Sequence, residues 1–209
     1  MRGCVGDYMK KYITLGIGVM VIGSSLLIGL NLRQENKISY NKDVEFSASY
    51  IIPDNLEQIE ERSTLIVEGV FTGERKLDKD EEVLGPSSIS QFKVNKVYKG
   101  TIDNNIISVI EPCEFENGNF INVEGYVPMQ EKEKYTIFLR ENKTEYGKQY
   151  TIVSLNFGKY NLSNKDTLEP ISEDIKHFSD VSELDFVSES SKECKIYNHV
   201  KEQVSQKYE

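Results

Sequence analysis

Two β-type runs within residues 63–100 constrain the fold of this chain more than any other stretch. Residues 65–71 and 89–98 are rich in β-branched and aromatic side chains, which is typical of strands. A loop with three basic and five acidic side chains, residues 73–88, separates the two runs, and a lysine–glycine pair ends the second one. This pattern predicts the first two strands of a small antiparallel barrel.

The same two strands carry signs of irregular pairing. Gly69 interrupts the first run, and a glycine inside a strand is typical of a bend or a β-bulge. In the second run Phe92 and Val94 alternate with polar residues, but Lys96 falls where an apolar residue is expected. This one-residue slip predicts a bulge near Asn95 and Lys96.

Further short strands are expected across residues 106–162, with no helix between them. Together with the first two, they predict a mainly β fold, an antiparallel barrel or sandwich of five to six strands. A turn is expected at residues 146–148. The expected strands are 106–110, 135–140, 150–155 and 159–162, with weaker signals at 120–123 and 126–127.

One short helix is expected before the barrel and one after it. Residues 53–61 fit a helix that Asp54 caps, with Glu57 completing a capping box. Near the C-terminus apolar side chains recur at helical spacing, which predicts an amphipathic helix over residues 192–207 that either docks on the barrel or frays. These apolar residues are Ile196, Tyr197, Val200 and Val204.

Residues 12–32 form a run of 21 residues with no ionisable side chain except that of Tyr12. A helix of this length spans about 30 Å, the thickness of a hydrocarbon core. We therefore expect a transmembrane helix that lies in the lipid bilayer and ends at Arg33. Lys10 and Lys11 abut the span and favour a cytoplasmic N-terminus, which places the following domain outside the cell membrane.

A cleaved signal peptide is the alternative for this segment. Residues 13–22 would form its apolar region, and Gly23 and Ser25 would be the small residues before the cleavage site. Cleavage there would leave the apolar residues 26–30 at the new N-terminus. An uncleaved, single-pass signal anchor is therefore favoured.

The organisation expected from these features has five parts. A cytoplasmic tail, residues 1–11, precedes the anchor, and a polar linker, residues 33–52, follows it. The barrel domain spans residues 53–163, and an acidic tail that contains the second helix spans residues 164–209. The chain has a net charge of −9. Because an acidic surface repels phosphate backbones, we expect no nucleic-acid partner.

No pattern of catalytic, cofactor-binding or metal-binding residues is recognisable. The two histidines, His177 and His199, lie in the acidic tail without further close ligands, whereas a zinc site draws on several at close spacing. Glu111, Glu114 and Glu116 have the oxygen chemistry of calcium sites but not the spacing of an EF-hand loop. A surface loop without an ion is the favoured interpretation, and we expect neither an enzyme nor a cofactor.

Two further groups of side chains are candidates for a role. Cys113 and Cys194 both lie outside the membrane in the expected topology, where an oxidising compartment permits a disulfide; two separate thiols are the alternative. Aromatic side chains of the barrel are candidates for a ligand-stacking face, although aromatic residues in strands are more often core residues. These aromatic residues are Phe120, Tyr126, Tyr146, Tyr150 and Tyr160.

Three segments carry a resemblance to a known class of domains. Residues 65–70 read LIVEGV, residues 92–100 read FKVNKVYKG and residues 134–139 read KYTIFL. In this succession, residues 54–162 resemble the uncharacterised membrane-anchored, extracytoplasmic OB-like β-barrel domains of Gram-positive bacteria. The resemblance implies a five-stranded Greek-key barrel, and it supplies no catalytic residues.

A function without catalysis follows from these expectations. We expect a membrane-anchored extracytoplasmic module that binds a protein or a component of the cell envelope. The alternative is an immunity- or inhibitor-like protein, which would contact a protein partner through the loop at residues 73–88 or through the C-terminal tail.

Overall fold

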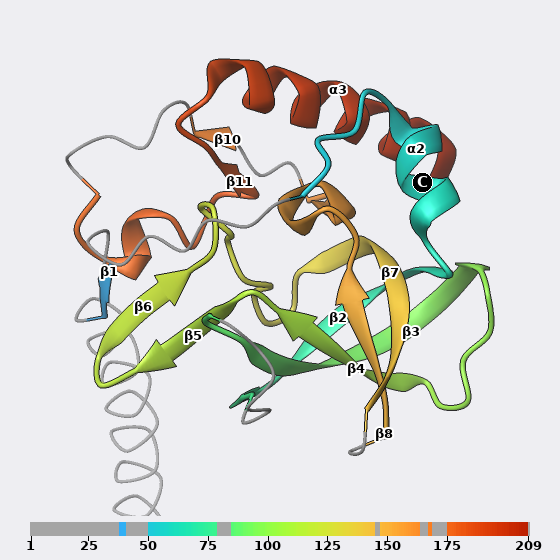
Figure 1. The fold of residues 1–209 in the computed structure, drawn as a ribbon, viewed down its shortest axis with the longest axis horizontal. Coiled ribbons are helices and arrows are strands. Elements are labelled where there is room, and N and C mark those ends of the chain that lie inside the picture. Colours follow the sequence, from blue (N-terminus) through green and yellow to red (C-terminus); the bar gives the residue numbers. More distant parts are fainter. Residues whose placement is uncertain are drawn as a thin grey trace, which may run out of the picture. The chain divides into compact units, whose positions relative to one another are not determined.

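Five strands curl into a closed barrel (Figure 1). The computed structural model describes residues 38–40, 50–78, 85–144, 147–163, 167–168 and 175–208. In spatial order the barrel strands are β2 (Leu65–Leu77), β3 (Ser88–Lys99), β4 (Ile106–Glu111), β8 (Gly147–Ile152) and β7 (Lys134–Thr144), and β7 pairs with β2 to close the ring.

The pairing within the barrel is antiparallel except between β4 and β8, which run parallel. A sixth strand, β9 (Lys159–Asn161), pairs with β7 outside the ring. The expected mainly β barrel of five to six strands is therefore confirmed. Its interior is largely apolar, because most of the inward-facing residues of its strands carry aliphatic or aromatic side chains.

The irregular pairing expected between the first two strands is also present. Glu68 faces Lys96 and the next residue, Gly69, faces Val94, so Asn95 is the extra residue of a bulge. No β-carbon fits at Gly69, because the backbone of β3 approaches it too closely. The glycine and the slipped alternation therefore mark one and the same bulge.

The charged loop is shorter than the sequence pattern indicates. β2 continues to Leu77 and β3 begins at Ser88, so residues 73–77 and 88 of the expected loop belong to the two strands. The backbone N–H of Asp78 donates to the carbonyl of Ser87 at 3.0 Å, which closes the base of the connection. Residues 79–84 lie outside the described part of the chain.

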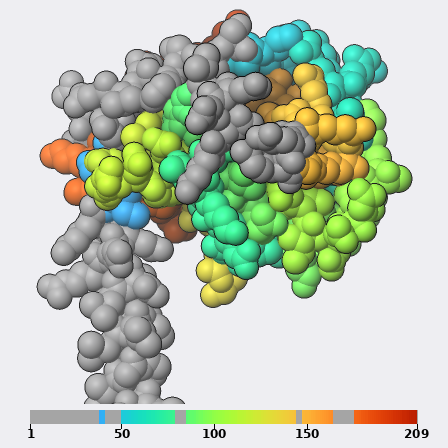
Figure 2. Space-filling view, turned by 60° about the horizontal axis from the view of Figure 1, so that its bottom comes forward, coloured from blue at the N-terminus to red at the C-terminus, as the bar shows by residue number. Residues whose placement is uncertain are grey.

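A second, smaller sheet lies beside the barrel. β5 (Cys113–Glu116) and β6 (Asn119–Asn122) form a hairpin, and the short β1 (Ser39–Tyr40) pairs with β6. Figure 2 shows the blue atoms of β1 beside the yellow-green atoms of this hairpin. The strand expected at 120–123 is confirmed, whereas residues 126–127 form no strand.

The leading helix is capped one residue later than expected. α2 (Leu56–Arg62) has Asn55 as its N-cap, and the Asn55 side chain accepts a hydrogen bond from the backbone N–H of Gln58 at 3.1 Å. The Gln58 side chain in turn accepts from the backbone N–H of Asp54 at 3.1 Å. The prediction of Asp54 as the cap, with Glu57 as its partner, was therefore wrong, although the helix itself is confirmed.

The C-terminal helix, α3 (Ser191–Tyr208), docks on the barrel beside α2 (Figure 1). Its apolar face meets β2, β7 and the 3₁₀ turn η1 (Leu155–Gly158) in one hydrophobic cluster. Burial of this face explains why an isolated amphipathic pattern forms a stable helix here. Its buried residues are Cys194, Tyr197, Val200, Val204 and Tyr208.

The acidic segment before α3 also packs against the rest of the fold. It contains the 3₁₀ turn η2 (Phe178–Asp180) and the parallel pair β10 (Thr167–Leu168) and β11 (Phe186–Val187). Several of its apolar side chains are buried, because they complete the core beneath α3 and beside the second sheet. These are Ile175, Phe178, Val181, Phe186 and Val187.

The expected membrane span, residues 12–32, lies outside the described residues. Among the helices of the described segments, none is long and apolar enough to cross a bilayer.

Candidate functional site

The aromatic residues proposed as a ligand-stacking face are core residues instead. The ring of Phe120 lies 4.7 Å from that of Phe178, and Tyr160 stacks on Tyr197 of α3 at 5.1 Å. Tyr126 and Tyr150 are buried as well, while Tyr146 lies outside the described residues. Because these rings pack against elements distant in sequence, four of the five are inaccessible to a ligand.

Of the two alternatives for Cys113 and Cys194, a disulfide and two separate thiols, the structure has the two thiols. Cys113 is buried in β5, and Cys194 is buried in α3, where it belongs to the hydrophobic cluster between the helix and the barrel. Each thiol therefore sits in a separate packing environment. Burial raises the pKa of the Cys113 thiol, so this group stays protonated at neutral pH.

Glu111 ends β4 and points into the barrel. It continues the inward alternation of Ile107 and Val109, and its side chain is fully buried. The guanidinium of Arg75 on β2 meets it there, with 2.7 Å between Arg75 Nη2 and Glu111 Oε2. Two residues that the sequence placed in polar loops thus form a buried ion pair.

The carboxylate of Glu111 is surrounded by donors. Burial by itself raises the pKa of this carboxyl, but the charge of Arg75 and hydrogen bonds from its neighbours outweigh burial and hold the pKa below its ordinary value. Glu111 is therefore ionised at neutral pH. Besides Arg75, its donors are the hydroxyl of Ser90, the hydroxyl of Tyr126 at 2.9 Å and the backbone N–H of Met129 at 2.8 Å.

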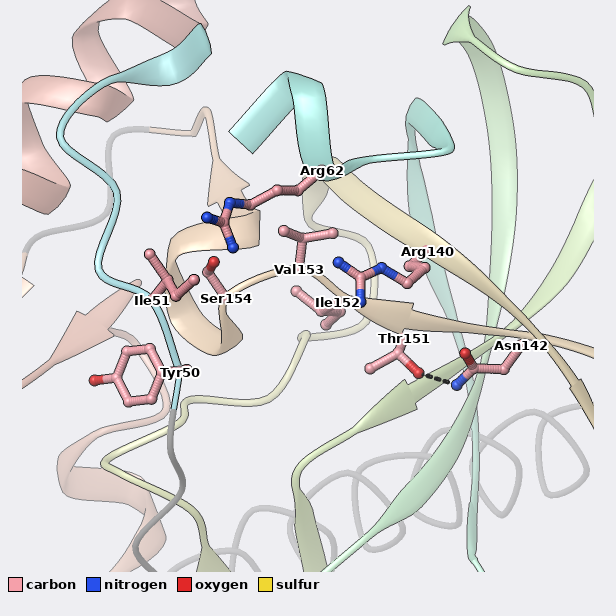
Figure 3. Close-up of a pocket in the computed structure, with 9 residues that line it drawn as sticks. All are labelled: Tyr50, Ile51, Arg62, Arg140, Asn142, Thr151, Ile152, Val153 and Ser154. Atoms are coloured by element: carbon pink, nitrogen blue, oxygen red, sulfur yellow. Dashed lines mark hydrogen bonds between the residues drawn. The ribbon is translucent and has the colours of Figure 1, made fainter. Parts of the chain in front are cut away.

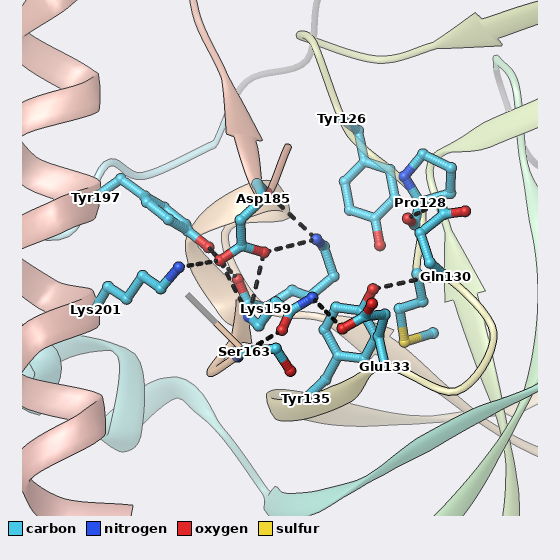
Figure 4. Close-up of polar contacts among 12 residues, drawn as sticks. Tyr126, Pro128, Gln130, Glu133, Tyr135, Lys159, Ser163, Asp185, Tyr197 and Lys201 are labelled. Carbon is cyan, nitrogen blue, oxygen red and sulfur yellow. Dashed lines mark hydrogen bonds and ion pairs between the residues drawn. The ribbon is translucent and has the colours of Figure 1, made fainter. Parts of the chain in front are cut away.

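A second buried ion pair joins the tail to the barrel (Figure 4). Lys159 Nζ on β9 lies 3.4 Å from Asp185 Oδ1, and both side chains are almost fully buried. From α3, the hydroxyl of Tyr197 donates to Asp185 at 2.6 Å, and the ammonium of Lys201 lies 3.1 Å from the same carboxylate. Asp185 thus links β9 to α3.

The two buried ion pairs are neighbours. Lys159 Nζ lies 5.6 Å from the centre of the Tyr126 ring, and the Tyr126 hydroxyl donates to Glu111. Both carboxylates accept several hydrogen bonds, which is the condition under which buried charges are tolerated. We interpret both networks as parts of the folded core.

Of the two buried carboxylates, only that of Glu111 could have been predicted from the sequence to be buried. Glu111 stands at an inward position of the alternating strand β4, two residues after Val109. Asp185 and Arg75 have no such signal, because their burial depends on partners 26 and 36 residues away along the chain.

An open cleft of about 370 Å³ lies between the end of α2, the strands β7 and β8, and the segment before α2 (Figure 3). Arg62 comes from the last turn of α2, and Arg140 comes from β7. In Figure 3 both side chains extend over the turn that follows β8. The other lining residues are Tyr50, Ile51, Asn142, Thr151, Ile152, Val153 and Ser154.

The register of the β7–β8 hairpin places the polar groups of this cleft. Arg140 lies directly opposite Thr151, and Asn142 donates from its side-chain amide to the Thr151 hydroxyl. Glu141, between them on β7, forms an ion pair with Lys148 at 3.0 Å instead. Because successive side chains of a strand point to opposite faces, the acidic residue is directed away from the two cleft residues.

Backbone strain is concentrated at the edge of the cleft. Ser154 and Leu155 both have left-handed backbone conformations, with φ of 55° and 52°. Such a conformation costs a residue with a β-carbon about 1–2 kcal/mol. The following turn is held tightly, because a β-carbon at Gly158 would overlap the carbonyl oxygen of Val153. Strained residues of this kind cluster at functional sites.

Tyr50 closes one side of the cleft. Burial, together with the nearby charges of Glu193 and Glu124, raises the pKa of Tyr50 to about 12. Its hydroxyl is therefore protonated at neutral pH and able to donate a hydrogen bond.

Within the described segments, no group of three or more histidine, cysteine or acidic side chains is arranged to hold a metal ion. Both histidines of the tail, His177 and His199, are exposed. The cleft is therefore a described site that combines a concave surface with accessible polar groups.

No protein-family model matches this chain, and a search of curated proteins finds no significant relative.

Proposed function

We propose that this chain is a membrane-anchored, extracytoplasmic binding module without catalytic activity, and that the cleft between α2, β7 and β8 holds its ligand. The barrel would present the cleft outside the cell membrane, and residues 12–32 would anchor it in the bilayer. The partner would be a protein or a component of the cell envelope.

The observation that carries this proposal is the contrast between the buried and the accessible charges. Glu111, Asp185 and Lys159 are saturated by contacts inside the core. Arg62 and Arg140, in contrast, line an open cleft, and no carboxylate of the described residues forms an ion pair with either guanidinium. Accessible arginines at a concave surface are typical of recognition sites.

We also propose that the barrel is of the OB type. Numbered along the chain, its five strands follow the order 1-2-3-5-4, the fourth closes on the first, and the third runs parallel to the fifth. This order supports the resemblance of residues 54–162 to OB-like extracytoplasmic domains. The cleft lies on the fourth and fifth strands, away from the face of strands two and three that OB domains use for oligonucleotides.

The structure offers less support for the alternative of an immunity- or inhibitor-like protein. The two ends of the loop at residues 73–88 belong to β2 and β3, and the apolar face of α3 is used in the core. The apolar face of α3 is therefore not free for a contact of the kind that such an inhibitor would use.

The location can be tested by labelling cysteines in cells. Cys113 and Cys194 are buried, so a membrane-impermeant maleimide would report on Cys4 and on an introduced cysteine in Ile106→Cys, whose parent side chain is 47% exposed. We expect the introduced cysteine to react in intact cells and Cys4 to react only after permeabilisation. Reaction of neither cysteine in intact cells would contradict the extracytoplasmic location, and absence of Cys4 from the mature protein would contradict the uncleaved anchor.

The ligand site can be tested by photo-crosslinking in the full-length protein in cells. A photoreactive residue would replace Ile51, which lines the cleft and is 50% exposed, or Ile106 on β4 as a matched control. We expect a defined adduct from position 51 alone, and its loss when Arg62 and Arg140 are both replaced by glutamine. Equal adducts from both positions, or none from position 51, would overturn the assignment of the cleft.

A further inference from the structure

The cleft has a charge opposite to that of the molecule. The whole chain carries 34 acidic and 25 basic residues, yet the nine residues that line the cleft include two arginines and no acid. Glu141, the acidic residue nearest in sequence to Arg140, is engaged by Lys148. The lining of the cleft is therefore positive, although the charges of Glu193 and Glu124 act on Tyr50 at its rim, and a positive lining attracts anions.

The two positive charges of the cleft come from arginine, which restricts the kind of anion that the cleft would bind. The described part of the chain contains three arginines, of which Arg75 forms an ion pair with Glu111. The other two, Arg62 and Arg140, line the same cleft. The planar guanidinium presents a fork of donors that matches the oxygens of carboxylate and phosphate groups, whereas lysine presents a point charge.

Neutral donors accompany the two guanidinium groups. Thr151 accepts from Asn142, which leaves the hydroxyl hydrogen of Thr151 available to donate. Ser154 and Tyr50 also line the cleft and carry hydroxyl groups; in Figure 3 the hydroxyl of Tyr50 points away from the two arginines. Hydroxyl groups of this kind can donate to the oxygens of a bound anion.

We infer that the cleft binds an oxyanion group of its ligand, a phosphate or a carboxylate, through Arg62 and Arg140. This inference rests on the proposed function, in which the cleft is the ligand site. Ile51, which is 50% exposed, contributes apolar surface to the same cleft, so the ligand carries a short apolar part next to its anionic group. A volume of about 370 Å³ is at the lower end of the range for small-molecule sites, so any larger remainder of the ligand lies outside the cleft.

The experiment follows the side-chain Nε–Hε signals of arginine in the full-length protein by nitrogen-15 NMR in detergent micelles. The chain has five arginines, so each signal can be assigned by substitution. Inorganic phosphate and, separately, acetate would be added at constant ionic strength. We expect the signals of Arg62 and Arg140 to move saturably with at least one of the two anions, while that of the buried Arg75 stays in place.

Substitutions in the cleft are compared with a control substitution outside it, by the affinity of each variant for the anion. Arg62→Gln and Arg140→Gln should each weaken the binding of that anion about ten-fold or more, because each removes charge-assisted hydrogen bonds. Arg140→Lys, which keeps the charge but loses the fork, should weaken it as well. Lys93→Gln removes one exposed positive charge from β3, outside the cleft, and should leave the affinity unchanged.

The two anions distinguish the sources of the oxyanion. Saturable binding of phosphate alone assigns a phosphate-bearing ligand, binding of acetate alone assigns a carboxylate, and binding of both assigns a general oxyanion site. Shifts that are linear in concentration, or equal to those caused by chloride, would overturn the inference. If the crosslink at position 51 persists in that case, the cleft is still the ligand site and only the oxyanion chemistry is wrong.

Discussion

Replacing Glu111 by glutamine tests the buried ion pair most directly. The substitution keeps the size of the side chain but removes its charge, and it leaves Arg75, whose side chain is only 16% exposed, against a neutral amide. Both carboxylate oxygens accept hydrogen bonds, so the new NH₂ group faces other donors. Removing one partner of a buried pair costs about 3–5 kcal/mol.

Urea unfolding of the full-length protein in detergent micelles measures this loss. The chain has 12 tyrosines and no tryptophan, so tyrosine fluorescence reports on unfolding. With a urea dependence of about 1–3 kcal/mol per molar, a loss of 3 kcal/mol lowers the midpoint by roughly 1–3 M. Glu116→Gln, an exposed change on the neighbouring strand β5, should shift the free energy of unfolding by less than about 0.5 kcal/mol.

The pH dependence provides a second readout. Because the folded-state pKa of Glu111 lies below its ordinary value of 4.5, the ionised carboxylate stabilises the fold above pH 4.5, and this stabilisation is lost as the pH falls through the folded pKa. The free energy of unfolding should therefore fall more steeply below pH 4.5 in the wild type than in Glu111→Gln.

A glutamine variant with the midpoint and the acid sensitivity of the wild type would refute this reasoning. If the variant does not fold, Ser90→Ala takes its place. Ser90 donates one hydrogen bond to the Glu111 carboxylate, and its removal should cost about 1.5–3 kcal/mol. An unchanged midpoint for Ser90→Ala would equally contradict the role of the pair.

Three further predictions concern the tail, a turn and the thiols. Asp185→Asn weakens the tie between β9 and α3, so amide hydrogen exchange in α3 should accelerate at least ten-fold relative to the barrel; equal rates would contradict the tie. Gly158→Ala should lower the thermal midpoint by several degrees, because its β-carbon overlaps the Val153 carbonyl; an unchanged midpoint would show that the turn relaxes. Cys113 and Cys194 should resist iodoacetamide until urea unfolds the protein, since both are buried; rapid native alkylation followed by mass spectrometry would contradict this.

The strands could be predicted because their signals are local. Gly69 and the slip at Lys96 each indicated the bulge, and the alternation around Phe92 indicated the strand that contains it. The helix over residues 192–207 could be predicted for the same reason, since its apolar spacing is visible in a single window.

The candidate site could not be predicted in this way. Arg62 and Arg140 are 78 positions apart in the numbering, and neither stands in a recognisable motif. They line one cleft only because α2 ends beside the β7–β8 hairpin once the barrel has closed. The prediction of an aromatic ligand-stacking face was wrong for a related reason. The sequence around a tyrosine in a strand does not show whether another element covers its ring.

The sequence by itself therefore determined the barrel strands, the two helices and the bulge at Gly69, since backbone preference and periodicity act over a few residues. Only the tertiary structure decided which charges are buried and which remain accessible. Arg75 meets Glu111 in the core, while Arg62 and Arg140 are left at an open cleft. The energy of a charge depends on its distance from solvent and from opposite charges. Both distances are set only when the chain folds into the closed barrel.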